Sequence, residues 1–122
     1  MLPGYWLQFI EDHKLLRRTA SVGEDADLSK LGAEMKFLTA AQSSDELANF
    51  WPGIGVAQDG YVPVASCLEG SGDYYYINSN DGSTGPLYRI YHDAVGPDGY
   101  DVQSAIDRVL DHYDSVLRYV EP

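Results

Sequence analysis

The sequence predicts an α+β fold, with a single antiparallel β-sheet, helices packed on one face and a long C-terminal amphipathic helix. Residues 73–78 and 87–91 are rich in aromatic and β-branched residues and flank the turn-forming stretch SNDGSTGP, as in a β-hairpin. From residue 102 onward, apolar residues recur every three or four positions, which predicts a helix over about 101–119 with Asp101 at its start. The 122 residues fit one domain, 1–122.

The N-terminal third supplies a predicted helix, a loop and a strand. Pro3 suits the first turn of a helix, and the apolar spacing that follows predicts a helix over about 3–15. Residues 21–30 are polar and lack apolar periodicity, so they are expected to form a loop. Residues 33–39 alternate between inward and outward types, as a half-buried strand does.

The middle of the chain predicts one helix and one further strand. Ser43 and Glu46 match the spacing of a capping box and predict a helix that ends near Phe50. Residues 60–68 form a β-rich run. Because Pro63 inside this run cannot donate a ladder hydrogen bond, the strand is expected at a sheet edge or to begin there.

The charge of the chain is strongly negative. Nineteen acidic residues against eight Lys and Arg give a net charge of −11, and the excess lies beyond the first twenty residues. Such a field repels nucleic acid and anionic membrane surfaces and attracts a basic partner. The alternative interpretation is that the charge serves solubility alone.

The sequence carries no sign of a membrane or secreted location. No apolar run approaches the ~18 residues that a membrane span needs. The N-terminal residues lack the basic region and small-residue cleavage pattern of a signal peptide. The single cysteine, Cys67, has no internal disulfide partner, so a cytoplasmic protein is expected.

The glycine-rich stretch GSGDYYYINSNDG matches none of three well-known functional loops. A phosphate loop requires a helix, and commonly a lysine, after its glycines, whereas Gly72 is followed by an acidic residue and a strand. A calcium loop counted back from Gly82 would place Ile77 at its first ligand position. A nucleophile elbow requires glycine where Glu69 stands.

Catalysis and metal binding have weak support. Cys67 lies in a β-rich run without a local signature for an activating base, and a small buried hydrophobe is the commoner role. His92 and Asp93 are neighbours on a strand end, where adjacent side chains point apart. The histidines show no metal-ligand spacing, so neither a metal nor a cofactor is expected. A small hydrolase using His92 or Cys67 remains the least favoured alternative.

Residues 59–93 resemble the core signature of the SUKH superfamily, which contains a fungal cell-wall-synthesis regulator and many bacterial toxin-immunity proteins. Its members have a strand with a pattern like "ipiasdgsGDyy.id", a turn, and a strand with a pattern like "GpVy.i.Hd". The matching residues are Val62, Pro63, Val64, Ala65, Gly72, Asp73, Tyr74, Tyr75, Ile77, Gly85, Pro86, Tyr88, Ile90, His92 and Asp93. Residues 2–10 look like the family's early "LP..y..Fl" element. The chain departs from the pattern at 12–16, where DHKLL replaces a glycine-rich turn.

The resemblance implies a protein-binding module and not an enzyme. Its immunity members bind and block a cognate toxin, and a toxin that acts on nucleic acid would present a basic groove to an acidic inhibitor. We expect Glu69, Asp73, Tyr75 and Asp81 to contact the partner. A scaffold or regulatory adaptor without a toxin is the alternative.

Two residues of the hairpin also have structural interpretations. Asp73 is suited to bond the backbone of the glycine-rich turn. Arg89 on the return strand is expected to form a surface ion pair of small value.

Overall fold

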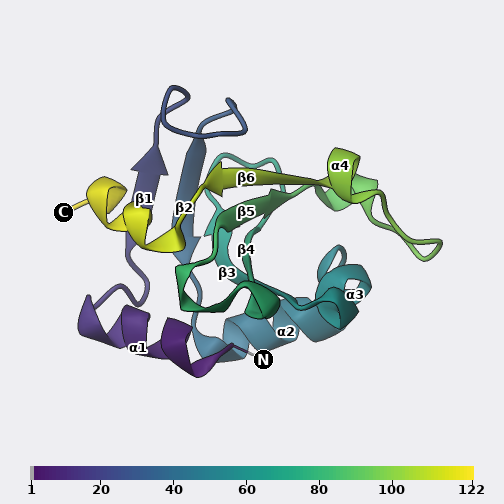
Figure 1. The fold of residues 1–122 in the computed structure, drawn as a ribbon, viewed down its shortest axis with the longest axis horizontal. Coiled ribbons are helices and arrows are strands. Elements are labelled where there is room, and N and C mark those ends of the chain that lie inside the picture. Colours follow the sequence, from purple (N-terminus) through teal and green to yellow (C-terminus); the bar gives the residue numbers. More distant parts are fainter. Residues whose placement is uncertain (1) are drawn as a thin grey trace.

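A curled six-stranded antiparallel sheet, with its strands in chain order, forms the centre of the computed structural model, which describes residues 2–122 (Figure 1). The strands are β1 (Thr19–Val22), β2 (Ala33–Phe37), β3 (Tyr61–Cys67), β4 (Tyr75–Asn78), β5 (Leu87–Ile90) and β6 (Ile106–Leu110). The α-helices are α1 (Gly4–Asp12), α2 (Ala40–Asn49), α3 (Gly53–Val56) and α4 (Val102–Ala105). Short 3₁₀ helices η1 (Ala57–Asp59), η2 (Ser79–Thr84), η3 (His92–Ala94) and η4 (Tyr113–Tyr119) complete the fold.

The predicted hairpin and most of the predicted elements are confirmed. β4 and β5 pair in antiparallel register, and η2 forms the connection longer than two residues that the sequence predicts. Gly70 and Gly72, which lead into β4, both have positive φ, at 79° and 81°. Glycine is favoured at both positions, because a residue with a side chain is strained in this left-handed backbone conformation.

The long C-terminal helix predicted over 101–119 is wrong. Asp101 does cap a helix, accepting a hydrogen bond from the Gln103 backbone N–H at 3.1 Å, but α4 ends after one turn. Ile106 then adopts extended angles, and β6 pairs with β5 from Ile90↔Ile106 to Leu87↔Leu110.

Two features explain why the apolar spacing misleads. A register shift in the β5–β6 pair lets the successive residues Val109 and Leu110 both be buried, which breaks strand alternation. After β6, η4 has the three-residue period of a 3₁₀ helix, which places Tyr113 and Val116 on one buried side. A bulged strand followed by a 3₁₀ helix therefore reproduces the spacing of a single α-helix.

Helices cover both faces of the sheet, and not one face as predicted. On β4, Tyr75 and Ile77 belong to the larger core with Trp6 of α1, while Tyr76 belongs to a second core with Val56 of α3. Tyr75 and Tyr76 lie in different cores because neighbouring strand residues point to opposite faces. A strand buried on both sides needs apolar layers above and below it.

The expected position of the Pro63 strand at an edge of the sheet is wrong, although Pro63 itself lies outside the β2–β3 pairing. β3 lies between β2 and β4. The β2–β3 pairing covers only Ala65–Cys67, so Pro63 faces no β2 residue and its missing backbone N–H costs no ladder hydrogen bond. The Pro63 carbonyl accepts a hydrogen bond of 2.7 Å from the Ser43 hydroxyl of α2.

The helix expected from the Ser43 and Glu46 pattern is present as α2, but its N-cap is Thr39, four residues before Ser43. Thr39 accepts a hydrogen bond from the Gln42 backbone N–H at 3.1 Å, and the Gln42 side chain accepts one from the Thr39 N–H at 2.9 Å. This pair forms the capping box of α2. Ser43 is not a cap, because its hydroxyl anchors the helix to β3.

Candidate functional site

The four residues expected to contact a partner do not share one surface. Tyr75 is fully buried and Asp73 is almost fully buried, whereas Glu69 and Asp81 are exposed. Asp81 accepts a hydrogen bond of 2.7 Å from the Tyr88 hydroxyl, and Glu69 accepts one of 3.2 Å from the Glu34 backbone N–H. Tyr75 is therefore a core residue and not a partner contact, and the same correction applies to Asp73.

Asp73 ties the glycine-rich segment to the end of β5. One carboxylate oxygen accepts hydrogen bonds from the His92 backbone N–H at 2.9 Å and from the His92 ring Nδ1 at 2.7 Å. This hydrogen bond raises the pKa of His92, opposed by partial burial and assisted by the charges of Asp73 and Asp93. His92 thus pairs with Asp73, not with the adjacent Asp93.

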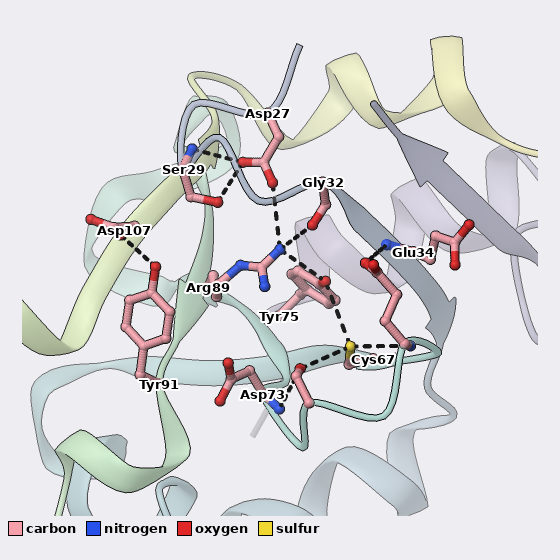
Figure 2. Close-up of polar contacts among 12 residues, drawn as sticks. Asp27, Ser29, Gly32, Glu34, Cys67, Asp73, Tyr75, Arg89, Tyr91 and Asp107 are labelled. Carbon is pink, nitrogen blue, oxygen red and sulfur yellow. Dashed lines mark hydrogen bonds and ion pairs between the residues drawn. The ribbon is translucent and has the colours of Figure 1, made fainter. Parts of the chain in front are cut away.

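Arg89 makes a buried ion pair in place of the expected surface one. Its Nη2 lies 3.4 Å from Asp27 in the connection between β1 and β2, and it also donates to the Tyr75 hydroxyl at 3.3 Å and to the Gly32 carbonyl (Figure 2). The guanidinium carbon lies 5.3 Å from the centre of the Tyr75 ring. These contacts hold the β1–β2 connection against the sheet.

Cys67 lies at the end of β3, half-buried, with three hydrogen-bond donors around its sulfur. The Ser71 hydroxyl lies 3.1 Å from Sγ, the Glu69 backbone N–H 3.4 Å, and the Tyr75 hydroxyl 3.9 Å (Figure 2). Burial raises the pKa of the Cys67 thiol, but these hydrogen bonds lower it by more, so the pKa lies below its ordinary value.

The geometry does not assemble a nucleophile and base from these two sites. Cys67 is bonded by hydroxyl and backbone groups, and His92 is bonded to Asp73; among residues 2–122 no hydrogen bond joins Cys67 to a histidine. A nucleophile needs a base within hydrogen-bond reach. No set of three His, Cys, Asp or Glu side chains in the described chain is arranged to hold a metal ion.

The basic residues are unevenly distributed along the chain, whereas the acidic residues are not. Between Lys36 and Arg108 the only Lys or Arg is Arg89, whose side chain is buried. The acidic residues of that stretch are Asp45, Glu46, Asp59, Glu69, Asp73, Asp81, Asp93, Asp98, Asp101 and Asp107. α3 and α4 belong to this stretch and lie at the end of the molecule opposite β1 and the C-terminus (Figure 1). Most of the net negative charge therefore comes from residues 37–107, because the nine acidic residues elsewhere are nearly balanced by seven Lys and Arg.

Two open pockets are lined by residues of this acidic stretch. The first, which we call the Tyr100 pocket, has a volume of about 440 Å³. It is lined by Gly55, Gln58, Asp59, Tyr61, Asn78, Gly99, Tyr100 and Val102. The second, which we call the Phe50 pocket, has a volume of about 500 Å³. It is lined by Leu38, Gln42, Asp45, Glu46, Phe50, Ser66 and Tyr74. Each combines two aromatic rings with one or two carboxylates and contains no basic residue.

No local sequence pattern indicates these pockets, because their lining residues come from segments far apart in the chain. The one usable signal was the absence of Lys and Arg from residues 37–88. No helix among the described residues is long and apolar enough to cross a membrane. Comparisons with protein-family models, curated proteins and solved structures each found no match to this chain.

Proposed function

We propose that this protein is a non-enzymatic binding module that binds a basic protein partner through the exposed acidic residues of 37–107, which we call the acidic face. We further propose, from the resemblance of residues 59–93 to the SUKH superfamily, that it is an immunity protein which blocks a toxin with a basic, nucleic-acid-binding surface. The partner's groove would be occupied by this chain in place of nucleic acid.

The observation that carries the proposal is the concentration of net negative charge in residues 37–107. Ten acidic residues lie between Lys36 and Arg108, and the single Arg between them is buried in an ion pair with Asp27. If the charge served solubility alone, an even distribution would serve equally well. An uneven field instead orients an approaching basic surface and raises its association rate.

The first test is capture of partners from a native lysate at low and moderate salt, identified by mass spectrometry. We expect a protein with a basic domain, retained at low salt and released as salt is raised, whose activity falls when this chain is added. An acidic partner that is indifferent to salt would contradict the proposal. A basic partner whose activity is unchanged would favour the adaptor alternative.

The second test measures association rates with the captured partner. Asp81→Lys on the acidic face should slow association and flatten its salt dependence. Glu24→Lys, an equal charge change at an exposed site outside that face, is the matched control and should have a smaller effect. Equal effects of the two substitutions would mean that net charge alone matters.

A further inference from the structure

We propose that the Tyr100 pocket and the Phe50 pocket each bind one Lys or Arg side chain of the same basic segment of the partner. This inference rests on the proposed function, since it names the contact site for the basic partner. It assigns the contact to α2, α3 and the pockets beside them, and not to the glycine-rich turn.

The Tyr100 pocket holds its carboxylate in a fixed position. The Asp59 carbonyl accepts hydrogen bonds from the side-chain amides of Asn78 and Asn80, each at 3.2 Å, and the Tyr100 hydroxyl donates to the Asp59 carboxylate. Gly60 follows at φ 95°, and a Cβ there would lie 2.6 Å from both of the asparagine side chains. The turn at Gly60 therefore fits only glycine. Because this turn already holds Asp59 beside Tyr61 and Tyr100, the Asp59 side chain need not be ordered when a ligand binds.

The Phe50 pocket carries two carboxylates close together. The pKa of Glu46 is raised above its ordinary value, first by burial and also by the neighbouring charge of Asp45. A hydrogen bond with Tyr74 acts in the opposite direction. A cation in this pocket would relieve the repulsion between the two carboxylates and would lie near the rings of Phe50 and Tyr74. Aromatic rings together with carboxylates favour a Lys or Arg side chain over a neutral one.

Exposed apolar side chains lie in the chain segment that links the two pockets. Phe50 lines one pocket and Gly55 lines the other, and between them Trp51 and Ile54 are each 41% exposed. Five residue steps span at most ~18 Å of chain. An extended partner segment of about six residues therefore reaches both pockets with its basic side chains while its apolar side chains contact Trp51 and Ile54.

The charge complementarity selects this occupant over others. A second copy of this chain would bring another net charge of −11 against the same acidic face. A neutral apolar segment would leave the charges of three pocket carboxylates, those of Asp45, Glu46 and Asp59, without a cation. A basic segment with apolar residues between its charges satisfies both parts of the surface.

The test is a titration of the full chain, followed by amide NMR, with a synthetic peptide that has two arginines separated by four residues including leucine. The matched probe has citrulline at both arginine positions, which keeps the shape and removes the charge. We expect saturable shifts at residues of both pockets and about 3- to 30-fold weaker binding of the citrulline peptide. Equal binding of the two peptides, or shifts spread over all acidic residues, would overturn the proposal.

Conservative variants then separate the pockets from net charge. Asp59→Asn and Glu46→Gln should each weaken binding of the arginine peptide several-fold, whereas Glu24→Gln, with the same change in net charge, should not. Circular dichroism confirms folding, and because Asp59 and Glu46 lie in different pockets, misfolding of one variant leaves the other as a test. Equal weakening by Glu24→Gln would overturn the proposal.

The captured basic partner distinguishes failure of the inference from failure of the proposed function. If the Asp59→Asn, Glu46→Gln double variant binds that partner as tightly as the native chain, the pockets are not the contact site, although the binding function stands. If no basic partner is captured and the arginine peptide does not bind, both proposals fail. If the chain forms dimers that Trp51→Glu disrupts, the occupant is a second copy and the inference is wrong.

Discussion

Asp27 and Arg89 lie 62 residues apart in the sequence and form an ion pair with Nη2–Oδ2 at 3.4 Å, with 0% and 4% of their side chains exposed. The other Asp27 oxygen accepts hydrogen bonds of 2.7 Å from both the backbone N–H and the hydroxyl of Ser29. Leu28 and Leu31, in the same connection, are both exposed. The β1–β2 connection is therefore held by the buried Asp27 and not by the leucine side chains.

Asp27→Ala should strongly destabilise the protein. Removing one partner of a buried pair leaves the other charge buried without compensation, which costs about 3–5 kcal/mol. Urea unfolding followed by circular dichroism measures this as a lower midpoint with little change in slope.

The surface pair Arg108–Asp111 is a matched control for that variant. Its N–O distance is also 3.4 Å, but its side chains are 57% and 67% exposed. Asp111→Ala should change the unfolding free energy by only ~0–1 kcal/mol, because solvent screens the charges. If the two variants are equally stable, burial does not determine the value of the Asp27–Arg89 pair.

Sequence patterns predicted local elements here better than long-range partners. The β4–β5 hairpin has its turn residues and both strands within 19 residues, 73–91, so local chemistry identifies it. The partner of Arg89 lies in a segment whose polarity predicts only a loop. No periodicity reveals that Asp27 turns inward.

The C-terminal segment illustrates a different limit. Its apolar spacing fits both an α-helix and a bulged strand followed by a 3₁₀ helix. Pairing with β5 decides between these two structures. Without β6, the outer edge of β5 would have unpaired backbone N–H and C=O groups. Tertiary pairing thus overrides the local pattern, and the pockets were missed for the same reason.

Thr39→Ala should destabilise α2 by about 1 kcal/mol, because the cap hydrogen bond to the Gln42 N–H is lost. Ser44→Ala, at an exposed position inside the same helix, should be neutral or slightly stabilising, since alanine has the higher helix propensity. Urea unfolding of both variants checks this. A larger loss at Ser44 than at Thr39 would contradict the assignment of the cap.

Ser71→Ala should raise the pKa of Cys67 and slow its alkylation by iodoacetamide near neutral pH. The Ser71 hydroxyl, 3.1 Å from Sγ, is the first of the hydrogen bonds that lower this pKa against the effect of burial. The ultraviolet absorbance of the thiolate, recorded against pH, gives the pKa directly. Ser66→Ala, whose hydroxyl bonds the Lys36 carbonyl and not the sulfur, should leave the titration unchanged.

The His92–Asp73 pair should make stability depend on pH in a defined direction. The folded-state pKa of His92 is raised above its ordinary value of 6.5, first by its hydrogen bond to Asp73. The protonated ring is thus favoured in the folded state. The resulting stabilisation is fully present below pH 6.5 and is lost as pH rises through the raised pKa.

Unfolding of the native chain and His92→Gln in urea, at a series of pH values from about 5.5 to 8.5, tests this sign. The native chain's advantage over the variant should be larger at the acidic end. In an NMR titration, Asp73→Asn should lower the His92 pKa, whereas Asp93→Asn should lower it less, because the Asp93 charge is the smaller cause. An advantage that grows with pH, or a larger effect of Asp93, would show that the pair does not stabilise the protonated ring.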